Sequence, residues 1–292
     1  MDIRGIFPPV PTPFDADGEI DREALRTQLR RLSRSPLAGA LVLGSNGEAG
    51  LLDDAEADAI VDTARAEVPR DRVLLVGTGR ESTRGTIAAC RRAAELGADA
   101  VLVRAPSFFK GQMTPEVLET HYRAVADASP APVLLYNVPG MAGFSFTLPF
   151  VRALAEHPNV IGMKETSNDL ERHAQFAMAS PGRFAVLSGW APVAYPAWVM
   201  GASGAIIAVA NVLPDVCVTL WNHFVAGRHD EARELQQRLL RIAQLVSSVH
   251  SVAGLKCALD LLGYPGGPVR PPLRSVSASA ADEIRTALQE WR

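Results

Sequence analysis

The chain has 292 residues, 48% of them hydrophobic, which is enough for two ordinary domains or for one α/β barrel with an additional segment. Its net charge of -3 comes without a basic tract, so we expect no nucleic-acid and no membrane partner. The cysteines lack CxxC spacing, so neither a disulfide framework nor a metal site is expected at Cys90, Cys217 or Cys257. The sequence has no secretory signal and no apolar run of ~18 residues, which predicts a cytoplasmic protein.

Apolar runs without polar alternation predict eight buried strands, at residues 6–14, 38–43, 72–76, 100–103, 133–136, 160–163, 184–189 and 204–208. Helical patterns follow most of these runs, at residues 21–34, 53–67, 82–96, from 114 onward and at 148–156. Strands that are buried on both faces and joined by helices form parallel sheets. Eight such units favour a closed (β/α)8 TIM barrel over an open doubly wound sheet. The run Gly77-Thr78-Gly79 lacks the third glycine of a dinucleotide-binding fingerprint, so it gives the open sheet little support.

The pattern changes to helices alone at about residue 226. Helical spacing of apolar residues predicts helices at 229–249, 252–262 and 279–291, the last after a proline-rich connector. We therefore expect a catalytic barrel over residues 1–225 and an appended C-terminal helical extension over residues 226–292.

Lys164 is the most informative single residue, because it directly follows the short apolar run Val160–Met163. Only three of the 29 basic residues are lysines, so a position that needs nothing but positive charge would usually be arginine in this chain. Burial among apolar neighbours favours a neutral lysine amine, and a neutral amine can attack a ketone to form a Schiff base. The alternative is a structural lysine that extends to solvent or pairs with Glu165.

Other polar residues also lie where predicted strands end, which is where barrel enzymes collect their catalytic groups. Ser45 and Asn46 follow the second strand, Tyr136 ends the fifth, and Thr166 follows Lys164. A hydroxyl, an amide and backbone N–H groups freed by glycines suit a carboxylate, and a tyrosine hydroxyl can relay a proton. Taken singly, Tyr136 could be a core aromatic residue, and Ser45 and Asn46 could be turn residues. Three strands that end in this way favour an active site.

Several motifs occur together and in order along the chain: Gly44-Ser45-Asn46-Gly47-Glu48, Tyr136-Asn137-Val138-Pro139, Gly162-Met163-Lys164-Glu165-Thr166 and Gly201-Ala202-Ser203-Gly204. With the opening segment from Gly5 to Phe14 and the late Gly254-Leu255-Lys256, they resemble the dihydrodipicolinate synthase and N-acetylneuraminate lyase superfamily over essentially the whole chain.

This resemblance implies a barrel with a C-terminal helical extension, in which Lys164 forms the imine and Tyr136 shuttles protons. It implies that Ser45 and Asn46 hold the carboxylate of bound pyruvate. No cofactor is expected beyond the covalent imine on Lys164, and the expected assembly is a homotetramer, a dimer of dimers. The expected substrate-binding set is completed by residues at three strand ends: Thr166, Gly189 and Ile206.

Departures from the synthase pattern narrow the expected activity. Met141 stands where the synthases carry an arginine that grips a carboxylate, and Phe108 stands where a second tyrosine reaches the neighbouring subunit. Neither replacement can do the original polar task. Thr166 matches the hydroxyl of the lyase branch, and the Gly266-Gly267-Pro268 run looks more like that of 4-hydroxy-2-oxoglutarate aldolases.

The prediction is therefore a pyruvate-dependent class I aldolase, a carbon-carbon lyase whose partner is a small oxo acid. Its substrate would be a 4-hydroxy-2-oxo acid, such as 4-hydroxy-2-oxoglutarate or a 2-keto-3-deoxy sugar acid, cleaved to pyruvate and an aldehyde. Three alternatives stay open: a 2-keto-3-deoxy sugar acid dehydratase, a dihydrodipicolinate synthase-like condensation, and a non-catalytic ligand-binding barrel.

Overall fold

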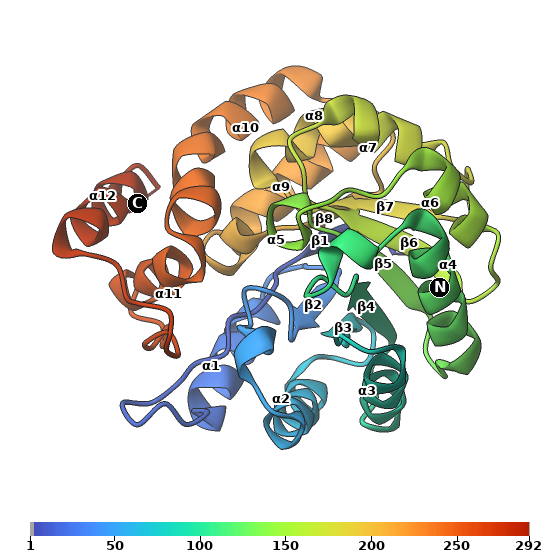
Figure 1. The fold of residues 1–292 in the computed structure, drawn as a ribbon. Helices are drawn as coiled ribbons and strands as arrows, with labels where there is room; N and C mark the ends of the chain where they lie inside the picture. The colour runs from blue at the N-terminus through green and yellow to red at the C-terminus, as the bar shows by residue number, and fades with distance from the viewer. Residues whose placement is uncertain (1–2, 292) are drawn as a thin grey trace.

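Eight parallel strands form the centre of the computed structural model, which describes residues 3–291 (Figure 1). The strands are β1 (Gly5–Phe7), β2 (Gly39–Val42), β3 (Val73–Gly77), β4 (Ala100–Arg104), β5 (Val133–Asn137), β6 (Val160–Glu165), β7 (Ala185–Ser188) and β8 (Gly204–Ile206). Their order in the sheet is β1-β8-β7-β6-β5-β4-β3-β2. Backbone hydrogen bonds between β1, β2 and the residues next to them close the sheet, from Ala38 N to Ile6 O at 3.1 Å and from Val10 N to Leu41 O at 2.8 Å. The predicted (β/α)8 TIM barrel is confirmed.

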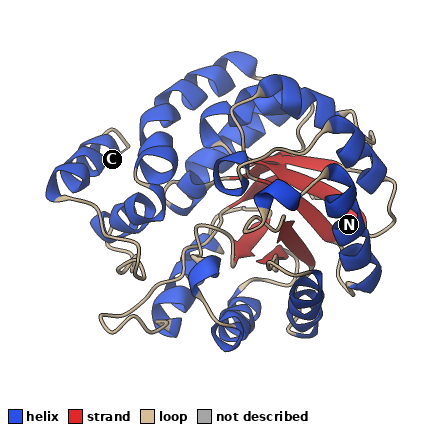
Figure 2. Ribbon diagram, viewed as in Figure 1, coloured by secondary structure: helices blue, strands red, loops and turns tan. Residues whose placement is uncertain are grey.

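Helices surround this barrel and continue beyond it (Figure 2). Those of the barrel are α1 (Arg22–Leu32), α2 (Asp54–Glu67), α3 (Thr83–Glu95), α4 (Pro115–Ala128), α5 (Pro139–Ala142), α6 (Leu148–Ala155), α7 (Leu170–Ala177), α8 (Ala194–Val199) and α9 (Pro214–Val225). Short 3-10 turns accompany them: η1 (Ala49–Leu51), η2 (Lys110–Gln112), η3 (Ala191–Val193) and η4 (Ala208–Asn211). The C-terminal helices are α10 (His229–Gln244), α11 (Ser251–Leu261) and α12 (Ala278–Gln289), with a π-helical turn η5 (Leu245–Val249) after α10.

Side-chain caps start the helices where the sequence predicts them. Asp21 accepts a hydrogen bond from Ala24 N at 2.9 Å at the start of α1. Asp53 and Glu56 form a reciprocal capping box at the start of α2, with bonds of 2.8 and 2.9 Å. These caps satisfy backbone N–H groups that a helix start otherwise leaves unpaired.

Side-chain alternation along the strands divides the core into two layers. In β4, Ala100 and Leu102 face the barrel interior, whereas Val101 and Val103 pack outward against the helices. Apolar side chains fill the interior of the barrel: Ile3, Phe7, Leu41, Leu75, Ala100, Leu102, Leu134, Tyr136, Val138, Leu187 and Ile206. A residue at the carboxyl end of a strand and on its inward face is therefore delivered to the mouth of the barrel.

Four strands are shorter than their apolar runs predicted; β2 and β7 each begin one residue later and end one residue earlier. The first, expected over residues 6–14, ends at Phe7, because prolines further along lack the N–H that a ladder needs, and only an isolated bridge joins Pro9 to Leu41. The last, expected to residue 208, ends at Ile206, and η4 follows.

The C-terminal helices share the outer core of the barrel, because buried side chains of α10, α11 and α12 belong to the same apolar cluster as the barrel helices. Figure 1 shows them stacked beside the barrel, in orange and red. Within residues 3–291, no helix is long and apolar enough to cross a membrane.

Candidate active site

Lys164 lies on β6, and its side chain is turned into the barrel. Strand alternation places Met163 and Glu165 on the outer face and Lys164 on the inner face, where it is 3% exposed. Its register partner on β5 is Tyr136, and Lys164 Nζ lies 3.5 Å from the Tyr136 hydroxyl. Across residues 3–291, Lys164 forms no ion pair with a carboxylate, so the alternative of a lysine paired with Glu165 is wrong.

Glu165 is instead buried on the opposite face of β6. Asn137 Nδ2 donates to Glu165 Oε2 at 2.6 Å, and Asn137 Oδ1 accepts from Phe146 N at 3.0 Å. Burial raises the pKa of the Glu165 carboxyl above its usual range, which favours the neutral form. The Glu165–Asn137 contact joins the ends of β5 and β6, so it fixes the strand positions next to Tyr136 and Lys164.

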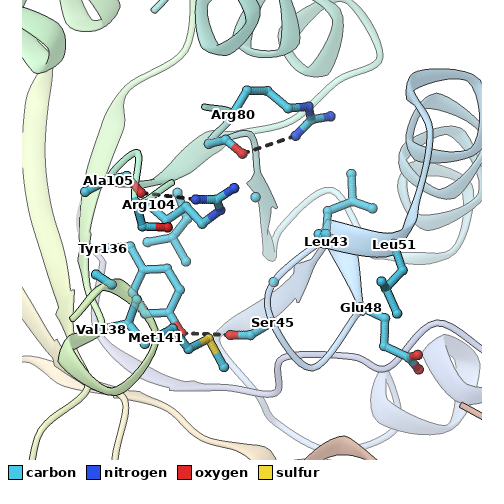
Figure 3. Close-up of a pocket in the computed structure, with 18 of the residues that line it drawn as sticks. Leu43, Ser45, Glu48, Leu51, Arg80, Arg104, Ala105, Tyr136, Val138 and Met141 are labelled. Atoms are coloured by element: carbon cyan, nitrogen blue, oxygen red, sulfur yellow. Dashed lines mark hydrogen bonds between the residues drawn. The ribbon is translucent and has the colours of Figure 1, made fainter. Parts of the chain in front are cut away.

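Tyr136 links the lysine to the turn that follows β2. Its hydroxyl lies 2.9 Å from Ser45 Oγ, and Figure 3 shows the tyrosine pointing toward that serine. The turn is tight, because Glu48 N donates to Ser45 O at 3.1 Å and Glu48 has a φ of 54°. Among the described residues, the backbone N–H groups of Ser45 and Asn46 donate no hydrogen bond. Two free N–H groups beside a hydroxyl form the kind of nest that binds an anion.

The other predicted substrate-binding residues differ in where they lie relative to Lys164 and Ser45. Thr166 Oγ1 is buried without a hydrogen-bond partner, and a Cβ on Gly189 would lie 2.1 Å from that oxygen and 2.7 Å from Lys164 Cε. Gly189 therefore leaves the space in which the Thr166 hydroxyl and the lysine chain fit. Asn46 is half-buried on the turn, and Ile206 is fully buried in the barrel wall.

A cavity of about 490 Å³ opens at the carboxyl ends of β2 to β5 (Figure 3). Ser45 and Tyr136 line it, whereas Lys164, whose Nζ lies 3.5 Å from the Tyr136 hydroxyl, is not part of its lining. The other predicted residues are also outside the lining: Asn46, Thr166, Gly189 and Ile206. The lining also includes three charged residues that were not predicted from the sequence as site residues: Arg80, Glu81 and Arg104. Alternation along β4 could have indicated Arg104, because it lies two residues after the inward-facing Leu102.

The C-terminal extension holds the turn that carries Ser45. Lys256 Nζ lies 2.5 Å from Glu48 Oε1 and donates to Pro268 O at 2.7 Å, and Arg270 N donates to Glu48 Oε2 at 2.9 Å. Burial lowers the pKa of Lys256, while the Glu48 carboxylate opposes this shift. The pairing of Glu48 with Lys256 was not predicted from the sequence.

Phe108 and Met141 differ in their relation to the cavity. Phe108 is 79% exposed and packs edge-on against Phe109 with a ring-centroid distance of 5.0 Å. Met141 is also exposed, and it lines the cavity beside Tyr136. Among residues 3–291, no three His, Cys, Asp or Glu side chains are grouped so that they could hold a metal ion.

Comparisons with known proteins agree with this architecture. The Dihydrodipicolinate synthetase family model matches residues 2–291. The chain is 37% identical to a 4-hydroxy-tetrahydrodipicolinate synthase of Xanthomonas campestris, covering 97% of this chain and 94% of that protein. It is 36% identical to an N-acetylneuraminate lyase of Rhizobium meliloti, covering 100% and 97%.

Two further similarities concern an aldolase and a pyruvate complex. The chain is 34% identical to the "Probable 4-hydroxy-2-oxoglutarate aldolase, mitochondrial" of Emericella nidulans, covering 96% of this chain and 92% of that protein. The structure of a prophage protein of the dihydrodipicolinic acid synthase family from E. coli K12, in complex with pyruvate, superimposes with a TM-score of 0.93. That structure is 31% identical and covers 99% of this chain and 98% of its own. The chain therefore belongs to the dihydrodipicolinate synthetase family, whose members related to it are lyases, aldolases and synthases.

Proposed function

We propose that this protein is a class I aldolase that cleaves a 4-hydroxy-2-oxo acid to pyruvate and an aldehyde through an imine on Lys164. The observation that carries the proposal is a buried amine without a carboxylate partner, 3.5 Å from a tyrosine hydroxyl that is itself bonded to Ser45. The similarity to an aldolase from Emericella nidulans and to a pyruvate complex supports this choice among the activities of the family.

The first half of the reaction forms the imine. The neutral Lys164 amine attacks the C2 carbonyl of the oxo acid and gives a carbinolamine. Tyr136 donates its proton to the carbinolamine hydroxyl, which leaves as water, and the product is a protonated imine. The Tyr136 phenolate then takes the proton of the C4 hydroxyl. The C3–C4 bond breaks, its electrons move to the imine nitrogen, and an aldehyde departs.

The second half returns the enzyme to its starting state. Tyr136 protonates C3 of the enamine, and water then attacks the resulting protonated imine while giving its proton back to the phenolate. The carbinolamine collapses to pyruvate and the free Lys164 amine. In this scheme one tyrosine serves as acid and base in turn, which its position beside the amine allows.

The turn after β2 would bind the C1 carboxylate of the substrate. The Ser45 hydroxyl and the free backbone N–H groups of Ser45 and Asn46 supply the donors. The Thr166 hydroxyl, which has no partner, lies beside Gly189 and the lysine chain, where it can bond to substrate or to a bound water. Ile206 contributes an apolar wall.

Two related reactions use the same imine. A dehydratase would expel a hydroxyl from a 2-keto-3-deoxy sugar acid after enamine formation and keep the carbon skeleton intact. A condensation of the dihydrodipicolinate synthase kind is disfavoured by Met141, because an exposed thioether cannot grip a carboxylate as an arginine does. A non-catalytic barrel would bind pyruvate without forming any imine.

Product analysis distinguishes these functions. The protein is incubated with a panel of 4-hydroxy-2-oxo acids and 2-keto-3-deoxy sugar acids, and products are identified by mass spectrometry. We expect pyruvate and an aldehyde in equal amounts. A dehydrated oxo acid of unbroken skeleton would instead identify a dehydratase, and the absence of turnover with any compound would contradict both enzymatic functions.

A further inference from the structure

Arg104 places a guanidinium group at the mouth of the barrel, directly beside Tyr136. It is the last residue of β4, on the inward face shared with Ala100 and Leu102, and its register partner on β5 is Tyr136. The side chain is partly exposed and lines the cavity that Tyr136 and Ser45 also line. In Figure 3 it extends from the Tyr136 side into the cavity.

The surrounding residues hold this side chain in place. A Cβ on Gly79 would lie 2.6 Å from Arg104 Cγ, so the glycine leaves the space in which the arginine lies. Arg104 Nη1 donates to Glu81 Oε1 at 2.8 Å and to Ala105 O at 3.1 Å. Glu81 is itself fixed, because its other oxygen accepts from the backbone N–H groups of Ser107 and Phe108 at 2.9 Å each.

Much of the hydrogen-bonding capacity of Arg104 is unused. Its hydrogen bonds to Glu81 and Ala105 both start from Nη1, and within residues 3–291 its Nε and Nη2 atoms donate to no other group. These two atoms carry three N–H donors, and two of them, one on each nitrogen, point in parallel to the same edge of the guanidinium plane. That edge matches the two oxygens of a carboxylate, which arginine binds through a pair of parallel bonds.

The rest of the lining suits a short substrate with few hydroxyls. Its walls are largely apolar, and the only hydroxyl-bearing side chains of the described lining are Ser45, Ser107 and Tyr136. The other polar side chains of the described lining are Glu48, Arg80, Glu81 and Arg104, so a polyhydroxylated chain would place much of its polar surface against apolar walls, which weakens binding. A charged contact gains strength from apolar surroundings, because the local dielectric constant is lower than that of water.

We propose that Arg104 binds a second carboxylate at the far end of the substrate, which makes the substrate a short dicarboxylic 4-hydroxy-2-oxo acid. This inference rests on the proposed aldolase function and names the substrate class for that site. Arg104 would be a specificity-determining residue, because pyruvate itself has no distal carboxylate and forms its imine without this contact.

The test compares two substrates that differ only at the distal group. 4-Hydroxy-2-oxoglutarate carries a carboxylate on C4, and 4-hydroxy-2-oxopentanoate carries a methyl group at the same position. We expect the wild-type protein to favour the dicarboxylate in kcat/KM by roughly 10²-fold, the usual worth of a paired charge-assisted contact. Arg104→Met should remove most of this preference by raising KM for the dicarboxylate alone. Arg104→Lys keeps the charge but not the paired bonds, and should retain part of it.

Arg92→Met is the matched control. Arg92 is exposed to a similar degree and also pairs with carboxylates, Asp54 at 2.8 Å and Asp58 at 3.2 Å, but it does not line this cavity. Its variant should keep the wild-type preference. Melting temperatures show whether each variant is folded. The comparison of the two oxo acids with wild-type protein does not depend on the folding of any variant.

The outcomes separate the two proposals. Borohydride trapping of pyruvate should be unchanged in Arg104→Met, because that imine does not involve the distal contact. If wild-type protein traps pyruvate but cleaves both oxo acids equally well, the role of Arg104 is refuted and the aldolase function stands. An equal loss of both activities in Arg104→Met also refutes it. If wild-type protein traps no pyruvate, the aldolase function itself is wrong, and the inference falls with it.

Discussion

Replacing Lys256 with methionine would leave a carboxylate uncompensated inside the protein. The Lys256 and Glu48 side chains are 2% and 0% exposed, and their charged atoms lie 2.5 Å apart. Lys256 Nζ also donates to Pro268 O and lies 4.4 Å from the centre of the Phe14 ring. Methionine is a similarly unbranched side chain, one heavy atom shorter, and it supplies none of these contacts.

The expected loss in the free energy of unfolding is large, because one partner of a buried ion pair is removed. Breaking such a pair typically destabilises a protein by about 3–5 kcal/mol, most of it from the charge that remains. Glu48 keeps its bond from Arg270 N at 2.9 Å, which favours the lower end of that range. At roughly 2 °C for each kcal/mol in a chain of this size, the lower end of that range lowers the Tm by about 6 °C.

The effect should reach the active site, because Glu48 also closes the turn that carries Ser45. Lys256→Met should therefore raise KM for the oxo acid as well as lower the Tm. The double variant Lys256→Met with Glu48→Gln removes both charges, and we expect it to recover about 1–3 kcal/mol.

Urea unfolding and steady-state kinetics measure these effects. Arg241→Met serves as control, since its 3.2 Å pair with Glu290 is about half exposed and should be worth less than about 1 kcal/mol. A Lys256→Met protein as stable as the wild type, or a double variant whose loss equals the sum of the single losses, would refute the reasoning.

Three further predictions concern the site and the pH dependence of stability. Tyr136→Phe should lower kcat by about 10²–10⁴-fold with little change in Tm, whereas Ser45→Ala should act mainly on KM. A Tyr136→Phe protein with a lowered Tm and a nearly unchanged kcat would show that Tyr136 is a structural residue. Gly189→Ala should reduce pyruvate trapping by at least about 10-fold, because its Cβ would lie 2.7 Å from Lys164 Cε, and full trapping would contradict this. Burial lowers the pKa of His121 from 6.5 to about 4, so on acidification His121 becomes protonated in the unfolded chain at a higher pH than in the folded protein. The free energy of unfolding should therefore fall as the pH drops from about 6.5 to 4, with about 3 kcal/mol of the loss due to His121. Urea unfolding at several pH values measures this dependence, which should be weaker in His121→Gln.

Local sequence patterns predicted the barrel well, because each βα unit is specified by a short run of neighbouring residues. The apolar run Val160–Met163 placed Lys164 at a strand end, and alternation with Met163 and Glu165 then turns the amine inward. The capping residues Asp21 and Asp53 fixed helix starts in the same local way.

Contacts between segments that lie far apart in the chain could not be predicted from local sequence patterns. Arg270 and Glu48 are 222 residues apart in the chain, and nothing in either neighbourhood identifies the partner. In the opening segment the prolines end the strand at Phe7, earlier than the extended run predicted. Side-chain alternation along β4 is enough to predict that Arg104 faces the barrel mouth. Which of its N–H groups stay unbonded depends on Glu81 and Gly79, which lie in another βα loop.

The central claim is that Lys164 forms an imine with pyruvate, and reductive trapping tests it most directly. The protein is treated with pyruvate and borohydride, digested, and mapped by mass spectrometry; the chain has only two other lysines, Lys110 and Lys256, as internal controls. The account predicts a reduced pyruvate adduct on Lys164 alone, and no adduct in Lys164→Arg. An unmodified Lys164, or an adduct on Lys110 or Lys256 instead, would contradict it.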